Sequence, residues 1–348
     1  MGSNRRLSEL RDYRIMPEEE SNTGERANER IITLLEGLGW TQRGISNVDI
    51  SCEKREHEQN EHGIDAYFTY SDPYLSARNA GRGILVESKS KKWNNWDGSS
   101  MNDACSQARQ ALECSALSED FRQKLDADTN RVINASIVSA WSNDGEFDLN
   151  KFRGYVEGCD IKPLSGGPYY LLVLGNDRLD KLASLHAKHV SIRTQYSEDK
   201  DRITNCDFGF FYPALHERKS EPKRRDAISF EYLFSDYIYS MLDYSRLSEN
   251  GTSVDSKQVG IVYTFDGTSF EELDFLQLSA REHGLLTADE IWVYAYSENT
   301  EEEDTIKEAS ISTLRERVLP EETEFHFSAL PHVDYKSYAD SILDEIDG

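Results

Sequence analysis

The amino-acid sequence predicts an α/β protein with two parts: a mixed β-sheet flanked by helices, and a second, smaller Rossmann-like α/β domain. Residues 63–89 hold two apolar, β-prone runs around a segment containing Pro, Asn and Gly, which is typical of a hairpin. Residues 132–187 alternate between strand and helix patterns, which favours parallel strands joined by helices. Residues 259–296 repeat this alternation as one strand–helix–strand unit.

The length and composition predict the domain organisation and the setting. A chain of 348 residues is longer than a single hydrophobic core usually extends, so we expect more than one domain. The predicted division is an N-terminal arm over residues 1–20, a first domain over residues 21–200 and a C-terminal α/β assembly or partner-binding domain over residues 201–348. Apolar runs are too short to cross a bilayer, and five cysteines without a C-x-x-C motif favour a reduced, cytoplasmic setting.

Local patterns predict the elements of the first domain in order. Thr23 is a good N-cap, and apolar residues recur at helical spacing from Ala27 until Gly39 ends the helix. A short strand is expected at residues 48–52, ahead of the hairpin. Beyond the hairpin we expect a helix at 102–117, a strand at 132–141, a helix at 149–156, a strand at 169–174 and a helix at 179–187.

Two pairs of histidines have spacings that metal ligands can have, and we interpret neither as a metal site. His57 and His62 lie five residues apart in a polar segment, which is typical of a surface loop. His186 and His189 have helical spacing but no third ligand near them in the sequence, so we expect an ordinary helix end. No cysteine stands in a recognisable Cys/His setting, so we set aside a hydrolase with a cysteine nucleophile.

The C-terminal part begins with an aromatic stretch. Several aromatic side chains within residues 230–244 fit a helical stripe, which predicts a core or interface helix. The strand–helix–strand unit follows, and no Gly-rich phosphate motif accompanies it, so we expect an assembly module rather than a nucleotide site. Its expected elements are strands at 259–265 and 291–296 around a helix at 270–281, and then helices at 305–318 and 335–346.

The hairpin brings three charged residues to one place. Side chains alternate along a strand, so Glu87 and Lys89 project from one face and Ser88 from the other. Antiparallel pairing can place Asp65 beside them, although it lies on the preceding strand. Two carboxylates and one ammonium group are therefore expected to meet at the end of a sheet.

These residue types suit a divalent-metal site. The carboxylates of Asp65 and Glu87 are hard oxygen ligands of the kind that Mg²⁺ or Mn²⁺ prefers, and the carbonyl of Ser88 is a further candidate ligand. Such a metal lowers the pKa of a bound water and neutralises charge on a phosphodiester. Lys89 can orient the attacking water or stabilise the developing negative charge. The three residues therefore predict a site that cuts phosphodiester bonds.

The order of these residues resembles a known signature. Gly63-Ile64-Asp65, followed one hairpin later by I-L-V-E-S-K, resembles the motif of PD-(D/E)xK nucleases, with Ile64 where that superfamily often has proline. The resemblance implies a restriction-endonuclease-like mixed sheet, Mg²⁺-dependent cleavage of DNA or RNA, and Asp65, Glu87 and Lys89 at the catalytic positions. DNA is the expected substrate because most relatives cut DNA. Nucleases with an added domain often resemble restriction or anti-phage defence components.

Three other polar residues are candidates for supporting the site. The segment GERANERIITLLEGLGW resembles the opening helix of archaeal Holliday-junction resolvases, and the glutamate of that family falls on Asn28. Either Asn28 orients a water where the family uses a carboxylate, or Glu25, about one turn earlier, takes that place. Gln107, with Gln110 as its rival, lies where related nucleases often have a glutamine that faces the active site.

The net charge of −25 opposes nucleic-acid binding, because such binding depends on Lys and Arg neutralising phosphates. Lys91 and Lys92, directly after the motif, are the candidate nucleic-acid contacts, and residues 219–225 form a second basic segment. Much of the acid is concentrated in residues 298–304, which need not face the substrate. A homo-oligomer or a complex with a basic partner subunit would complete the binding surface.

A rival hypothesis follows from the same charge. The chain would then be a non-catalytic acidic assembly subunit or a protein that imitates DNA, with Glu87 and Lys89 as solvated residues and Asp65 in a turn. The electrostatics distinguish the two: a nuclease needs positive potential around Lys89, Lys91 and Lys92, and a DNA mimic needs negative potential there.

Overall fold

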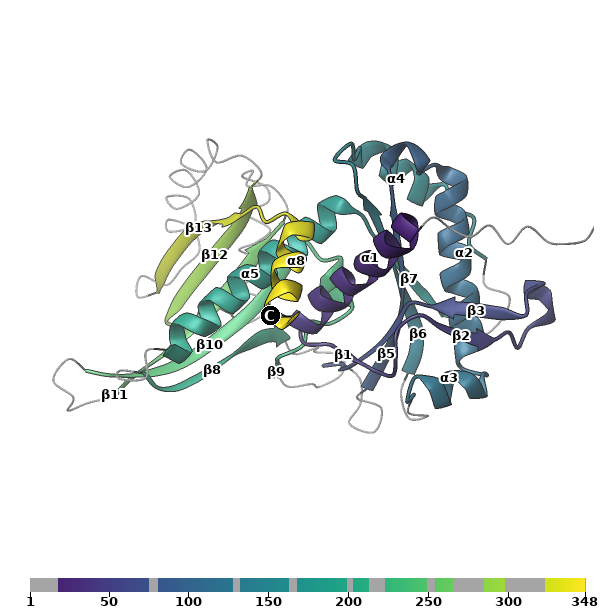
Figure 1. Cartoon of the computed structure of the whole chain (residues 1–348). Coiled ribbons are helices and arrows are strands. Elements are labelled where there is room, and N and C mark those ends of the chain that lie inside the picture. Colours follow the sequence, from purple (N-terminus) through teal and green to yellow (C-terminus); the bar gives the residue numbers. More distant parts are fainter. Residues whose placement is uncertain are drawn as a thin grey trace, which may run out of the picture.

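The structure is a computed structural model in which two β-sheets lie side by side, with helices between and around them (Figure 1). It describes residues 18–74, 81–127, 132–162, 168–198, 203–212, 223–248, 254–265, 285–297 and 323–347. Most of the expected N-terminal arm lies outside these residues, as do the helices expected at 270–281 and 305–318 and the acidic segment 298–304.

The first sheet and its helices take up the first half of the chain. The helices are α1 (Glu18–Gly37), α2 (Gly98–Ser115), α3 (Glu119–Lys124), α4 (Leu149–Glu157) and α5 (Asn176–Glu198), with 3-10 turns η1 (Arg55–His57) and η2 (Trp93–Asn95). The strands are β1 (Thr41–Gln42), β2 (Val48–Ser51), β3 (Glu61–Ile64), β4 (Ala66–Ser71), β5 (Gly81–Lys91), β6 (Val132–Ser142) and β7 (Tyr170–Leu174).

This first sheet is mixed, as the sequence predicts. Its order is β1-β4-β5-β6-β7, in which β1, β4 and β5 pair antiparallel and β5, β6 and β7 pair parallel. The expected hairpin is confirmed: β4 and β5 pair antiparallel, with Ala66 opposite Val86. The β2–β3 hairpin stands apart as a two-stranded sheet that leads directly into β4.

Helices cover both faces of the first sheet. Along β5, Ile84 and Val86 join a cluster with the apolar stripes of α1 and α5, whereas Leu85 on the opposite face packs with the end of α2. Nearer the start of α2, Ala104 and Ala108 pack on the same face of the sheet, against β6. The alternation of side chains along a strand therefore gives a three-layered α/β/α arrangement that buries β5 on both faces.

The second sheet has six strands in the order β13-β12-β11-β10-β8-β9. Three strands pair parallel (β11, β12, β13), and β8, β9 and β10 extend the sheet with antiparallel pairs. The strands expected at 259–265 and 291–296 are confirmed as parallel neighbours, but a Rossmann-like domain is not. The elements are β8 (Ile203–Tyr212), β9 (Lys223–Arg225), η4 (Glu231–Leu233), β10 (Tyr237–Leu247), β11 (Val254–Thr264), η5 (Leu285–Thr287), β12 (Glu290–Ser297), β13 (Glu324–Pro331) and α8 (Tyr335–Asp347).

The prediction of a helix within residues 230–244 is wrong. The segment forms the short turn η4 and then β10, whose residues from Ile238 to Leu242 are all buried. When both faces of a strand are buried, its sequence is a continuous apolar run without the period of two that identifies a half-exposed strand. The richness of the segment in Tyr and Phe was the better indicator, because these residues favour strands.

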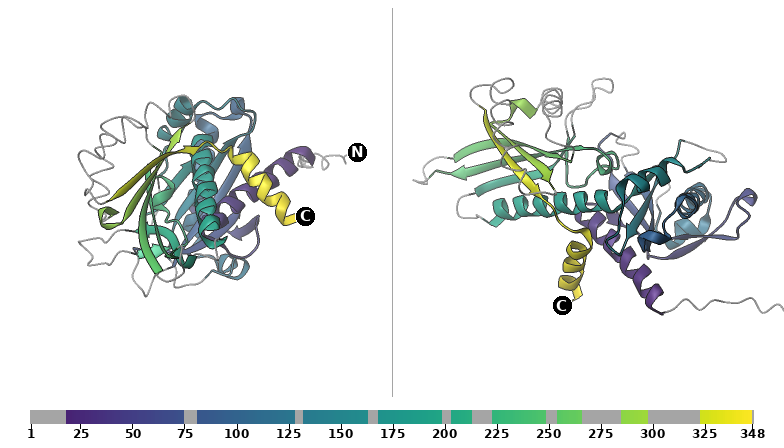
Figure 2. Two further views of the ribbon diagram at one scale, coloured as in Figure 1. Left: turned by 90° about the vertical axis from the view of Figure 1, so that its left-hand side faces the viewer. Right: turned by 90° about the horizontal axis from the view of Figure 1, so that it is seen from above.

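Helix α5 connects the two sheets. Its first turns pack on the first sheet through Leu179 and Leu182, and farther along His189 stacks on Phe208 and Phe210 of β8, with ring centroids 4.2 and 4.5 Å apart. Seen from above, α5 runs along the second sheet and into the first (Figure 2). His186 and His189 therefore lie well inside a longer helix than expected, and both are buried. Helix α8 packs against α1 and α5 and closes this junction.

Candidate active site

The end of the β4–β5 hairpin gathers the three predicted charged residues. Asp65 lies directly before β4, and its Oδ2 accepts a hydrogen bond of 2.6 Å from the backbone N–H of Ser88. Glu87 and Lys89 project from the same face of β5 and form an ion pair. The Glu87 side chain is 9% exposed and that of Lys89 is 32% exposed, so the site opens to solvent through the lysine.

The electrostatics of this group show charges in conflict. Burial, together with the negative charge of Asp65, raises the pKa of Glu87 to about 7 from its ordinary value of 4.5. Burial also raises the pKa of Asp65, although the hydrogen bond from Ser88 and the charge of Lys89 oppose the shift. For Lys89 burial acts against the ammonium form, but the carboxylates outweigh it and raise its pKa. The two carboxylates carry more negative charge than the one ammonium group of Lys89 can neutralise, so a second cation at this place would be stabilised.

Two asparagines hold the backbone of Asp65. Asn28 of α1 donates from Nδ2 to the Asp65 carbonyl oxygen at 3.1 Å and to the side chain of Asn47 at 3.2 Å. The backbone N–H of Asn47, a residue with the left-handed φ of 57° that asparagine tolerates, donates to the same carbonyl at 3.0 Å. Asn28 is buried, and its Oδ1 has no hydrogen-bond partner among the described residues. Glu25, the alternative, is exposed on the first turns of α1.

The remaining predicted residues lie farther out. Gln107 is exposed on α2 and its rival Gln110 is half-buried, on the helix that covers the Glu87 face of the first sheet. The Lys91 ammonium lies 5.0 Å from the centre of the Trp96 ring, which holds the side chain near the end of β5. Lys92 is exposed directly after this strand.

The donor set fits a hard divalent cation. Asp65, directly before β4, and Glu87 on β5 supply carboxylate oxygens, and Ser88, the residue after Glu87, donates its backbone N–H to the Asp65 carboxylate. Mg²⁺ and Mn²⁺ are commonly held by one or two carboxylates and complete their coordination with water or substrate. Burial is the largest cause of the raised pKa of both carboxyl groups, and a bound cation would stabilise their charged forms.

Sequence reasoning missed a second group of side chains. The structure brings together Cys52, His57, His62 and Cys114, and the two histidines are buried, so the interpretation of their segment as a surface loop is wrong. A C-x4-H-x4-H spacing was the available signal in the sequence. The fourth residue lies on α2, far along the chain, and only the packing of that helix on the β2–β3 hairpin brings it near.

The fold and the geometry of the hairpin agree with the PD-(D/E)xK nuclease motif that the sequence predicts in this region. In agreement, residues 16–178 match the family model described as the GAPS4 protein PD-(D/E)XK nuclease domain. The match contains both hairpin strands and the helix that carries Asn28. A comparison with curated proteins found no match. No helix among the described residues is both long and apolar enough to span a membrane.

Proposed function

We propose that the chain is a metal-dependent nuclease that hydrolyses phosphodiester bonds of DNA, with Asp65, Glu87 and Lys89 as its catalytic residues. The observation that carries the proposal is the meeting of two buried carboxylates and one lysine at the end of a β-hairpin, inside a region that matches a nuclease domain. In the rival hypothesis of a non-catalytic subunit these side chains have no reason to converge, because burying like charges is costly.

Each residue has a distinct role in this proposal. Asp65 and Glu87, with the carbonyl of Ser88, would hold Mg²⁺ or Mn²⁺, which supplies an activated water and neutralises charge on the phosphate. The Asp65 backbone cannot move freely, because Asn28 and Asn47 both donate to its carbonyl oxygen. The scaffold thus fixes the first ligand before substrate arrives, which is the preorganisation that such sites need.

Lys89 acts as a cation rather than as a base. Its pKa is raised by the neighbouring carboxylates, so it stays protonated at neutral pH and cannot remove a proton from water. An ammonium group at this position can donate hydrogen bonds to the attacking water or to the oxygen atoms that gain negative charge. Asn28 has a buried Oδ1 to accept a hydrogen bond from a water molecule, which favours its predicted role over that of the exposed Glu25.

The proposed substrate is DNA, in keeping with the superfamily, and the charge of the chain bears on how it is bound. Lys91 and Lys92 extend the positive end of β5, but the net charge of −25 favours help from a second copy or from a basic partner subunit. We place the protein in the cytoplasm, where its free cysteines would stay reduced. The GAPS4 name of the matching family supports a part in anti-phage defence.

The test is cleavage of circular and linear DNA, and of RNA, by the full chain with Mg²⁺ or Mn²⁺. We expect cleavage that stops when the divalent ion is chelated and that is lost in Glu87→Ala and Lys89→Ala. The matched control is Lys151→Ala, since Lys151 is an exposed lysine on α4 that pairs with Asp148, the N-cap of the same helix. Equal cleavage by the wild type and both site variants would contradict the proposal, as would cleavage that survives chelation.

A further inference from the structure

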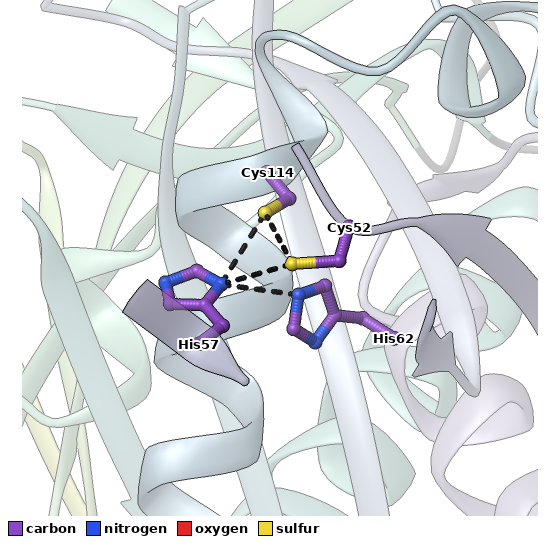
Figure 3. A group of neighbouring side chains, drawn as sticks. All are labelled: Cys52, His57, His62 and Cys114. Carbon is purple, nitrogen blue, oxygen red and sulfur yellow. Dashed lines mark hydrogen bonds between the residues drawn. The ribbon is translucent and has the colours of Figure 1, made fainter. Parts of the chain in front are cut away.

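The Cys/His cluster, defined as Cys52, His57, His62 and Cys114, lies between the β2–β3 hairpin and α2. In Figure 3 the four side chains point toward one another, with His57 at the centre of the contacts. One ligand atom from each lies within 4.8 Å of the corresponding atom of the others. His57, His62 and Cys114 are buried and Cys52 is half-buried, so the cluster is closed to solvent on most sides.

The distances from the His57 Nδ1 to the other three ligand atoms, and between the two sulfurs, match those of a tetrahedral site. The two Sγ atoms are 3.8 Å apart, the His57 Nδ1 is 3.5 Å from each of them, and it is 3.1 Å from the His62 Nε2. Zinc bonds are about 2.3 Å long to sulfur and about 2.0 Å to nitrogen. Tetrahedral bonds of those lengths put the two sulfurs about 3.8 Å apart, a sulfur and a nitrogen about 3.5 Å apart and the two nitrogens about 3.3 Å apart.

The local structure explains how the hairpin presents three of these ligands. Cys52 directly follows β2, and its N–H donates to the Asn60 carbonyl, which closes the hairpin at 2.8 Å. His57 ends the turn η1, and Glu58 then takes the left-handed φ of 54° that reverses the chain. The reversal returns His62 on β3, where it pairs with Ile50 of β2. Cys114 comes from the last turn of α2.

A buried carboxylate supports the cluster from outside. The His57 Nε2 lies 2.9 Å from Oε2 of Glu113, whose side chain is fully buried. Glu113 also pairs with Lys54 and Arg109, which favours its carboxylate form. That carboxylate can accept a hydrogen bond from the Nε2–H of His57. His57 then has its Nδ1 lone pair free to face the centre of the cluster, as in the carboxylate–histidine–zinc arrangements of metal sites. The backbone N–H of Glu53 points to the Cys114 sulfur at 3.4 Å, a contact that suits a thiolate.

We propose that Cys52, His57, His62 and Cys114 bind a zinc ion as a structural site, separate from the carboxylate site on β5. Two thiolates and two imidazoles are a common ligand set for Zn²⁺, and four protein ligands leave no position for water or substrate. A disulfide between the cysteines does not account for the geometry, since a sulfur–sulfur bond is about 2.05 Å long. Nor would it explain why two histidines converge on the same point.

The ion would tie the β2–β3 hairpin to α2. This hairpin is only four residue pairs long and is not part of either large sheet, so it has little hydrogen bonding of its own to fix it. Asp65 follows its last strand directly. A zinc crosslink here therefore fixes the segment from which the first carboxylate of the candidate active site emerges.

The first test is the metal content of the full chain, purified under reducing conditions without chelator and measured by inductively coupled plasma mass spectrometry. We expect about one zinc per chain in the wild type and in Asp65→Ala, and a loss of at least half in Cys114→Ser and in His62→Ala. Cys206→Ser on β8 is the matched control and keeps its zinc. Zinc that disappears in Asp65→Ala but stays in Cys114→Ser would overturn the proposal, because the ion would then belong to the carboxylates.

A second measurement uses the unmodified chain, so that a variant that fails to fold cannot decide the result. X-ray absorption at the zinc edge is expected to show sulfur neighbours at about 2.3 Å and nitrogen neighbours at about 2.0 Å, in equal number. Replacement by Co²⁺ is expected to give the visible absorption of a tetrahedral thiolate site. A zinc shell of oxygen and nitrogen only, or a metal-free chain that binds no Co²⁺ at the thiols, would overturn the proposal.

Discussion

The two polar clusters, the carboxylate cluster and the Cys/His cluster, differ in almost every physical property. The carboxylate cluster of Asp65, Glu87 and Lys89 is made of hard, charged groups, and it opens to solvent through a partly exposed lysine. The Cys/His cluster is made of soft donors that converge in a closed site, with a buried carboxylate behind one histidine. One stretch of chain joins them, because β3 ends only one residue before Asp65.

This difference suits two different roles: the carboxylate cluster is suited to catalysis, and the Cys/His cluster is suited to stabilising the fold. A site that must take in a substrate keeps open coordination positions and tolerates unfavourable charge, whereas a site that only holds the fold uses all its ligands on the ion. The raised pKa values of Asp65 and Glu87 are the sign of unfavourable charge in the first site. In the second site the distances from the His57 Nδ1 to its three neighbours, and between the two sulfurs, match those around a tetrahedral ion. Four predictions test this division, from the largest expected effect to the smallest.

Removal of one carboxylate is expected to have the largest effect. Asp65→Asn keeps the shape of the side chain but removes its charge, so we expect metal-dependent cleavage to fall by on the order of 10³-fold. Zinc content is expected to stay at the wild-type level, because Asn can still accept the Ser88 hydrogen bond that holds the segment. Initial rates of DNA cleavage and the metal content of the same preparation check both halves. Loss of zinc together with activity would show that the two clusters are not separate.

Removal of a zinc ligand is expected to affect stability first. Cys114→Ser should lower the melting temperature of the full chain by on the order of 10 °C, because metal binding contributes directly to the folded state. The fall should be reproduced in the wild type by a strong chelator such as a phenanthroline. Differential scanning calorimetry gives the measurement, and Cys206→Ser is the comparison variant. A Cys114→Ser chain that melts with the wild type, in the presence and absence of chelator, would contradict the structural role.

The buried carboxylate behind His57 is expected to tune the affinity. Glu113→Gln keeps the volume of the side chain but weakens its hold on the His57 proton, so we expect zinc affinity to fall by about 10- to 100-fold. Competition with a chromophoric zinc chelator measures the change. Glu119→Gln, an exposed glutamate on α3, should bind zinc as the wild type does. An unchanged zinc affinity in Glu113→Gln would contradict the proposed role of Glu113 in supporting His57 as a ligand.

The smallest effect is a pH dependence of stability in the metal-free active site. The pKa of Glu87 in the folded chain, about 7, lies above its ordinary value of 4.5, so the folded state loses stability as pH rises through this window. Glu87→Gln cannot ionise, and we expect this variant to be more stable than the wild type by about 3 kcal/mol at pH 8, with the difference fading below pH 4.5. Denaturant unfolding without Mg²⁺ at both pH values checks the sign. A variant less stable than the wild type at pH 8 would contradict the described charge conflict.

The sequence was most informative where a local pattern decides the structure. The β4–β5 hairpin, with Glu87 and Lys89 on one face, follows from the period of two along the strand and from the Pro- and Gly-containing turn. Helix α8 was also predicted close to its observed bounds, because its apolar residues recur at helical spacing. Helix α1 was predicted as a helix, but it begins at Glu18, so Thr23 lies inside it and is not its N-cap. The role of each residue at the hairpin stays a prediction until activity is measured.

The features that could not be predicted from the sequence are those that depend on packing between residues far apart in the chain. The strand β10 is buried on both faces, so its apolar run carries no period. The Cys/His cluster needs α2 to bring Cys114 against the β2–β3 hairpin, and a polar composition around His57 and His62 hid their burial. Helix α5 and the adjoining apolar cluster join the two sheets, a contact that no local pattern reports, and the predicted domain boundaries stay a prediction.

The most direct test of the division is Mn²⁺ binding to the zinc-loaded full chain, followed by electron paramagnetic resonance in the wild type and in Glu87→Ala. The account predicts that the wild type binds exchangeable Mn²⁺ that Mg²⁺ displaces, while its zinc stays in place, and that Glu87→Ala loses this binding and keeps its zinc. Equal Mn²⁺ binding by both chains would contradict the assignment of a divalent-metal site to the end of the β4–β5 hairpin.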